Sequence, residues 1–283
     1  MTRRATLAGV SLGPDAPVAV MGALNVSPES FHAGSVHVER DDLVTAALAM
    51  VEAGAALIDV GARSTAPYGT SSVSDGEERL RLARAVEALA AKVPVPISAD
   101  TARLGPARAA LDAGARVIND VSGLRDPEVA ALIRERRAGA ILMAFPSAAP
   151  SRLSPIATVK TLLWDALERA RAAGIEDERV VLDPGIGFFR GERVDWPEWD
   201  AAVLAGLGEL LPLGRPLCVG VSRKSFLGAI IDRLRTEDRL AGSLAATAVA
   251  VWNGASLVRA HDVAETLDAV RIAERIRRTG GTL

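Results

Sequence analysis

Short apolar runs recur along the chain and alternate with longer segments whose apolar residues have helical spacing. Each run is too short to form an independent helix and ends in polar or glycine-rich residues, which is typical of buried β-strands. The eight runs cover residues 18–24, 57–60, 95–98, 117–118, 141–143, 180–182, 217–221 and 257–258.

The segments between these runs carry signals for helices. Helical spacing covers residues 41–53, 127–137, 155–173, 237–252 and 262–277. A further helix is expected to begin at Ser74, because Ser74 and Glu77 have the spacing of a capping box. Three helix-to-strand connections, at residues 52–57, 112–117 and 252–257, carry a glycine where a helix C-cap requires positive φ.

Strands that alternate with helices predict parallel pairing, because each connection is long enough to hold a crossover helix. Eight such units predict an α/β protein, a single (β/α)8 TIM barrel over residues 1–283 without a domain boundary. A doubly wound open sheet is the alternative that the pattern leaves open. The proline-rich loop 146–155, after the fifth strand, is a candidate lid.

Composition narrows the class of protein. Lys and Arg total 33 against 35 Asp and Glu, so the chain lacks the basic character of a general nucleic-acid binder. Residues 1–19 contain no apolar signal region and no run reaches the length of a membrane span, so we expect a cytoplasmic protein without membrane partners. The single cysteine, Cys218, excludes an intrachain disulfide and is expected to be buried.

Polar side chains gather at the predicted carboxyl ends of the strands, where barrel enzymes carry their active sites. Acids and amides follow the earlier strands, and they can accept hydrogen bonds from the N–H groups of a planar amino-heterocycle. Cations follow the last two strands, where barrels often bind phosphate. The residues are Asn25, Asp59, Asp100, Thr101, Asn119, Asp120, Asp183, Ser222, Arg223, Lys224, Ser225, Arg259 and His261.

Structural interpretations compete with a site at these positions. Asp59 and Asp120 could cap helices or shape turns, the charges around Lys224 could be a solvated run, and a lone His261 is usually structural. The chain has no Cys/His cluster with zinc spacing and no phosphate-binding P-loop. The convergence of these side chains at one barrel mouth nevertheless favours a small-molecule site.

Seven segments, in order along nearly the whole chain, resemble the signatures of dihydropteroate synthase and the wider pterin-binding family. They are 21–31 (MGALNVSPESF), 59–67 (DVGARSTAP), 97–101 (ISADT), 118–123 (INDVSG), 182–188 (LDPGIGF), 220–226 (GVSRKSF) and 258–262 (VRAHD). The resemblance implies that 6-hydroxymethyl-dihydropterin diphosphate condenses with an arylamine, p-aminobenzoate in the family, and that diphosphate leaves. It also implies a homodimer and Mg²⁺ bound with the substrate diphosphate.

The resemblance implies roles by position. The residues implied to bind the pterin are Asp100, Asn119, Asp183 and Lys224, flanked by Met143 and Phe188. Asn25 would meet the Mg²⁺-bound diphosphate, while Arg259 and His261 would bind the diphosphate as it leaves. The residues implied near the arylamine are Thr65, Pro67 and Ser225. The predicted catalytic set is Asn25, Arg63, Lys224, Arg259 and His261.

Two loops and the end of the fifth strand depart from the family pattern. Glu29 and Ala33 stand where the family usually has aspartates, and Ala66 stands where it has a diphosphate-contacting arginine. Arg63 could substitute for that arginine. Ala144 replaces the usual histidine after the fifth strand. The pattern resembles the archaeal-type branch associated with methanopterin pathways, which would suit a larger amine such as a ribofuranosyl-aminobenzene derivative.

Two other functions stay open from the sequence. A tetrahydropterin-dependent methyltransferase would use the same barrel class without a diphosphate. A pterin-binding protein with little catalysis is supported by Ala33 and Ala66, since both loops that handle the diphosphate and the amine are altered.

Overall fold

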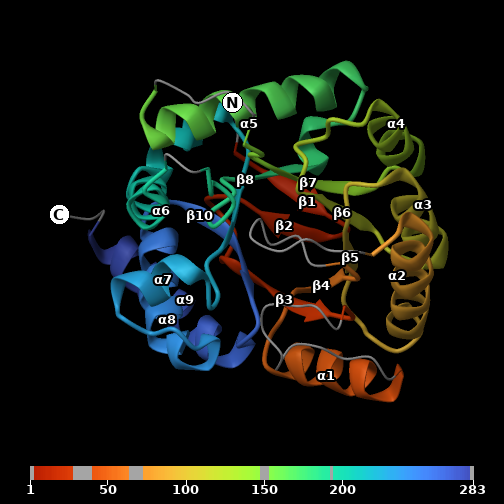
Figure 1. The fold of residues 1–283 in the computed structure, drawn as a ribbon, viewed down its shortest axis with the longest axis horizontal. Coiled ribbons are helices and arrows are strands. Elements are labelled where there is room, and N and C mark those ends of the chain that lie inside the picture. Colours follow the sequence, from red (N-terminus) through yellow and green to blue (C-terminus); the bar gives the residue numbers. More distant parts are fainter. Residues whose placement is uncertain (1–2, 28–39, 64–72, 147–152, 192–193, 281–283) are drawn as a thin grey trace.

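A closed barrel of eight parallel strands forms the centre of the molecule, and helices surround it (Figure 1). The computed structural model describes residues 3–27, 40–63, 73–146, 153–191 and 194–280. The strands close in the order β10-β3-β4-β5-β6-β7-β8-β9. The predicted TIM barrel is confirmed, and the open doubly wound sheet is wrong. The strands are β3 (Ala19–Asn25), β4 (Leu57–Gly61), β5 (Ile97–Asp100), β6 (Val117–Asp120), β7 (Gly139–Met143), β8 (Val180–Asp183), β9 (Leu217–Gly220) and β10 (Ala255–Ala260).

The helices follow the strands in regular alternation. Ser74 Oγ accepts from the backbone N–H of Glu77 at 3.2 Å, as the capping spacing predicts. Gly54, Gly114 and Gly254 have φ angles of 103°, 117° and 105°, which confirms the predicted helix ends. The helices are α1 (Arg40–Glu52), α2 (Asp75–Ala90), α3 (Leu104–Ala113), α4 (Pro127–Arg136), α5 (Pro155–Ala172), α6 (Trp196–Ala205), α7 (Ser225–Ile230), α8 (Leu240–Trp252) and α9 (Val263–Gly280), with 3₁₀ turns η2 (Asp177–Arg179), η3 (Leu207–Leu213) and η4 (Thr236–Arg239). Among the described helices, none is both long and apolar enough to cross a bilayer.

Some elements differ from the sequence-based expectation. The strand expected at 95–98 is β5, two residues later, because Pro96 has no N–H to donate to the sheet. The helix expected from residue 237 begins as η4 and becomes α-helical only at Leu240. The helices α3, α6 and α7 are short, with 10, 10 and 6 residues, and were not predicted.

An antiparallel hairpin, β1 (Ala5–Leu7) and β2 (Val10–Leu12), was also missed by the sequence. Its Leu7 and Leu12 are buried in one cluster with inward-facing residues of the barrel strands, including Met21 and Leu57. The hairpin therefore closes the amino-terminal end of the barrel, and it keeps water out of the floor beneath the site.

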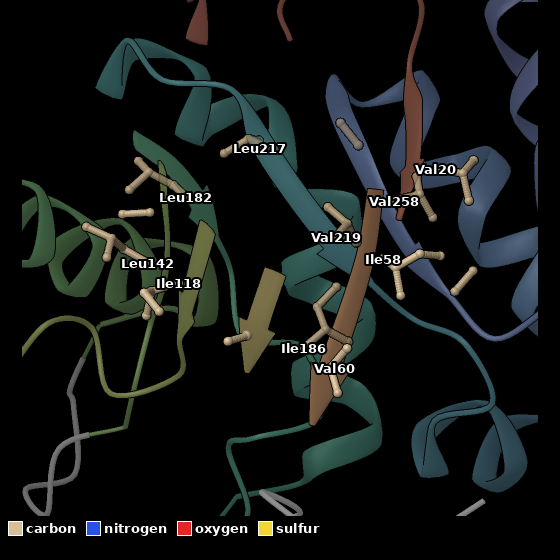
Figure 2. Packing of buried hydrophobic residues seen from close by; sticks show 14 of the residues in the cluster. Val20, Ile58, Val60, Ile118, Leu142, Leu182, Ile186, Leu217, Val219 and Val258 are labelled. Atoms are coloured by element: carbon tan, nitrogen blue, oxygen red, sulfur yellow. The ribbon is translucent and has the colours of Figure 1, made fainter. Parts of the chain in front are cut away.

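Alternation along each strand separates two apolar layers. Of two successive residues in a strand, one packs outward against the helices; examples are Val20, Ile58 and Val258 (Figure 2). Its neighbour, such as Leu57 or Leu257, packs inward. The buried Cys218, as predicted, belongs to the inward layer. The next inward position lies at the carboxyl end of the strands, and there five of the eight strands carry a polar side chain.

Candidate functional site

The polar layer at the carboxyl end of the barrel comes from alternate residues of five strands. The side chains are Asp59 on β4, Asp100 on β5, Asn119 on β6, Asp183 on β8 and Arg259 on β10. Each lies two residues after a buried inward-facing residue, which is apolar in four of the five strands and Ser98 in β5, so strand geometry alone places it inside the mouth.

Arg259 joins two carboxylates across the barrel. Its Nε donates to Asp59 Oδ2 at 2.7 Å, and its Nη2 donates to Asp100 Oδ2 at 3.4 Å. Asn119 Nδ2 donates to the same Asp59 oxygen at 3.1 Å. Asp59 is fully buried within its strand, so the interpretation of Asp59 as a helix cap is wrong. It is a site residue that the predicted set omitted.

Asp100 is placed to accept a ligand donor. Burial raises the pKa of Asp100 to about 7, and the nearby Asp59 carboxylate adds to the rise, while Arg259 opposes it. The Oδ1 atoms of Asp100 and Asp59 are buried and form no hydrogen bond with a described residue. Buried acceptors without partners need an explanation, and a planar ligand with N–H groups supplies one.

Asp183 and Lys224 lie on the other side of the mouth, where their opposite charges interact. Asp183 Oδ1 accepts from the Gly185 N–H at 2.7 Å, and the Lys224 ammonium lies 4.8 Å from the centroid of Phe188. Burial raises the pKa of Asp183, while the Gly185 N–H and the Lys224 ammonium act to lower it. Burial lowers the pKa of Lys224 to about 8, while the Asp183 carboxylate acts to raise it. The lysine is therefore mainly an ammonium donor at neutral pH, and the interpretation of a solvated charge run is wrong.

Gly187 gives Lys224 its path into the site. A Cβ at Gly187 would lie 2.7 Å from Lys224 Cδ, and the φ of 91° also disfavours other residues. The preceding Arg223, in contrast, is structural, because its guanidinium donates to both oxygens of Asp262 at 2.8 and 2.7 Å.

His261 follows β10 and is oriented by Ser222. The backbone N–H of His261 donates to Ser222 Oγ at 3.2 Å, and Ser222 Oγ lies 3.0 Å from His261 Nδ1. Because the hydroxyl oxygen already accepts from the backbone, the geometry favours donation from the hydroxyl to Nδ1, which makes Nε2 the N–H. Asp120 shapes a turn, which is one of the structural roles expected for it, because its Oδ1 accepts from the N–H and Oγ of Ser122 at 2.6 Å each.

Glu78 of α2 is a buried hub that the sequence did not reveal. Its Oε1 accepts from Thr101 Oγ1 at 2.6 Å, and its Oε2 lies 3.0 Å from Arg103 Nη1 and 3.2 Å from Arg63 Nε. The carboxylate is 1% exposed. Arg63 is thereby held at the carboxyl end of β4, two residues past the strand. The capping-box spacing of Ser74 and Glu77 predicted only that a helix begins here.

Asn25 and Asp100 flank the bare backbone of Gly61. A Cβ at Gly61 would lie 3.3 Å from Asn25 Oδ1 and 3.7 Å from Asp100 Oδ2. Met143 ends β7 and is 2% exposed, and its place beside the pterin stays a prediction. The residues predicted at Thr65 and Pro67, the departures at Glu29, Ala33 and Ala66, and most of the candidate lid lie outside the described residues.

The fold and this geometry define a class of protein. A parallel β/α barrel whose mouth holds buried acids and an amide beside cations is the framework of an enzyme that binds a planar amino-heterocycle and an anionic group. A family model described as pterin binding enzyme matches residues 21–261, and the chain belongs to this family.

Similar proteins agree with this assignment. The chain is 38% identical over 270 residues to dihydropteroate synthase of Mycobacterium leprae, covering 91% of this chain and 93% of that protein. Xanthomonas albilineans dihydropteroate synthase, solved with 4-aminobenzoic acid, has a TM-score of 0.86 at 37% identity, covering 98% of this chain and 99% of that chain. A second structure, in complex with 7,8-dihydropteroate, has a TM-score of 0.83 at 36% identity, covering 97% and 98%. The prediction of a pterin-condensing transferase is confirmed.

Proposed function

We propose that the chain condenses 6-hydroxymethyl-dihydropterin diphosphate with p-aminobenzoate and releases diphosphate, a step of folate synthesis. The observation that carries the proposal is the buried acceptor layer of Asp100, Asn119 and Asp183 beside Lys224. The relatives solved with 4-aminobenzoic acid and 7,8-dihydropteroate hold the amine and the product that this reaction requires.

The acceptor layer does two things in this reaction. Asp100, Asn119 and Asp183 accept from the N–H groups of the pterin and fix the ring. When the bond from the pterin methylene carbon to the diphosphate oxygen breaks, positive charge develops on the pterin, and the two carboxylates stabilise it. The amine nitrogen then attacks the methylene carbon, the C–N bond forms, and the nitrogen loses a proton.

Arg63 and Arg259 provide the cationic side of the mouth for the diphosphate, and His261 provides a further donor. Arg259 already pairs with Asp59 and Asp100, so it holds the acceptor layer as well as facing the substrate. The Nε2 side of His261 offers an N–H donor to an anionic oxygen. Arg63 is the cation nearest in the sequence to Ala66, where the family has its arginine, and Glu78 keeps Arg63 in place.

Mg²⁺ fits this site through the substrate. The described residues contain no cluster of three His, Cys, Asp or Glu side chains that could hold a metal. Mg²⁺ is often bound by one or two protein oxygens together with substrate phosphates and water, and Asn25 Oδ1 beside Gly61 is one such oxygen. When bound, Mg²⁺ would neutralise charge on the leaving diphosphate.

A diphosphate-release assay tests the function. The protein and Mg²⁺ are mixed with 6-hydroxymethyl-dihydropterin diphosphate and either p-aminobenzoate or its ribofuranosyl derivative. Release that depends on p-aminobenzoate supports the proposal. Release with the ribofuranosyl derivative alone would replace the folate assignment. No release with either amine, alongside measurable pterin binding, would favour a pterin-binding protein.

The finer placement in the methanopterin-associated branch stays a prediction. The residues that carry it, 27–31 and 64–68, lie almost entirely outside the described residues. The arm of the assay with the ribofuranosyl amine checks this placement.

Replacing Arg63 by alanine is expected to lower kcat by about 10- to 100-fold, because a charge-assisted contact to the leaving group is lost. Pterin affinity should change by less than about twofold, since Arg63 pairs with Glu78 outside the acceptor layer. Arg103→Ala is the matched control, because Arg103 pairs with the same carboxylate. Turnover and pterin affinity are measured for both variants. Equal losses of turnover and affinity in Arg63→Ala would contradict this role.

The homodimer has support on the outer surface. Val249 and Trp252 of α8 and Ile272 and Ile276 of α9 are exposed by 44%, 51%, 64% and 52%, and the two helices pack side by side. An exposed apolar patch of this kind marks an interaction surface. Light scattering should give twice the chain mass of 29.5 kDa, and Ile272→Glu should shift the mass towards the monomer. A native protein with the mass of one chain would contradict the homodimer.

A further inference from the structure

Arg190 lies in the loop after β8 and reaches the start of α7. Its Nη2 donates to Asp200 Oδ2 at 3.0 Å and to Ser225 Oγ at 3.1 Å. Its guanidinium also lies 4.4 Å from the ring centroid of Trp196, and the side chain is only 10% exposed. These contacts fix the planar guanidinium in one orientation relative to Ser225.

Asp200 of α6 anchors this arrangement. The carboxylate is fully buried, and its Oδ1 accepts from the Gly187 N–H at 2.9 Å. One side chain thus fixes both the glycine that admits Lys224 and the arginine that reaches Ser225. A buried ion pair contributes little net stability compared with apolar packing. Stability alone therefore does not account for Arg190 next to the site.

Ser225 is left with a donor to offer. Its oxygen accepts from Arg190, and its hydroxyl hydrogen bonds to no other described residue. The side chain is partly exposed and directly follows Lys224, which lies in the pterin half of the site. A hydroxyl donor beside a guanidinium suits an anionic oxygen better than a neutral one.

We propose that Arg190, held by Asp200, orients the Ser225 hydroxyl towards an anionic group on the arylamine and so selects amines that carry a carboxylate or a phosphate. The inference rests on the proposed function, which supplies the arylamine. Asp200 balances the charge of Arg190, so the effect comes from the direction of the hydroxyl rather than from long-range attraction. Arg190 is therefore a positioning residue that acts through Ser225.

The test compares kcat/KM for p-aminobenzoate with kcat/KM for the neutral p-aminobenzamide. Arg190→Met is expected to lower the value for the acid by about 10- to 100-fold and the value for the amide by less than about twofold. Ser225→Ala should show the same selectivity loss. The double variant should lose no more than either single variant, because the two residues act on one contact. Arg190→Lys keeps the charge without the fork and should fall between native and Arg190→Met.

Arg171 provides the matched control. It donates to Asp177 at 3.0 and 2.8 Å and lies 6.0 Å from the centroid of Trp164. The pair has the same chemistry as Arg190 with its aspartate and tryptophan, but it precedes β8 at the opposite end of the barrel. Arg171→Met should leave the selectivity between acid and amide unchanged.

Equal losses for the acid and the amide in Arg190→Met would show a structural role and overturn the proposal. A second measurement does not need turnover: calorimetry of pteroate and its amide, with the native protein and Arg190→Met. A loss of affinity for pteroate alone supports the proposal. Unchanged affinities, or equal losses for pteroate and its amide, overturn it. A native protein that releases no diphosphate yet shows the selective loss would overturn only the proposed reaction.

Discussion

Replacement of Asp183 by asparagine is expected to weaken pterin binding by about 200- to 1,000-fold. Two charge-assisted hydrogen bonds from ring N–H groups would be lost, at about 1.5 to 2 kcal/mol each. The side-chain amide of the asparagine would also place its N–H donors against the N–H donors of the pterin ring. Titration of the pterin substrate by calorimetry measures the change.

The stability of this variant separates a binding effect from misfolding. Burial raises the pKa of Asp183, so the free protein gains nothing from keeping this carboxylate charged. We therefore expect the melting temperature of Asp183→Asn without ligand to be close to that of the native protein. Asp268→Asn, at a side chain 79% exposed, is the control and should retain full affinity. Native affinity in Asp183→Asn would remove Asp183 from the pterin site.

Replacement of Arg259 by methionine is expected to destabilise the protein by about 3 to 5 kcal/mol above pH 8, because two buried carboxylates lose their shared cation. Asp59 and Asp100 lie 2.7 and 3.4 Å from the guanidinium and have no other cation within ion-pair distance among the described residues. Urea unfolding of the free protein at several pH values measures the loss.

The pH dependence identifies the cause. The folded pKa of Asp100 is raised to about 7, so the folded protein binds this proton more tightly than the unfolded chain, and stability falls as pH rises from about 4 to 7. Without Arg259 the pKa rises further, and the fall extends to higher pH. The destabilisation should therefore be clearly smaller at pH 5.5, where Asp100 is protonated, than at pH 8.5.

A compensating change gives the control for Arg259. The double variant Arg259→Met with Asp59→Asn removes one of the two carboxylates, and it should recover part of the stability at pH 8.5. The same loss at pH 5.5 and pH 8.5, with no recovery in the double variant, would mean that the apolar stem of Arg259 matters and its charge does not.

The sequence by itself determined the barrel and the residues that face the pterin. Strand runs separated by helix-length intervals permit few topologies, and alternation within a strand decides which side chains point inward. Asn119 and Asp183 follow an inward-facing valine by two positions, and Asp100 follows the buried Ser98, so their inward placement could be predicted from local geometry. The hairpin was missed because its two short strands carry little periodic signal.

Only the tertiary structure decided how the site residues are held. Asp59 and Arg259 are separated by 200 residues and meet only because the last strand closes on the first. Glu78 reaches Arg63 from a helix, and Arg190 reaches Ser225 from a neighbouring loop. Local pattern reports which face a side chain occupies, because backbone periodicity sets that face. The partner of a side chain depends on the closure of the barrel and on burial, because burial weakens the screening of charge and strengthens such polar contacts.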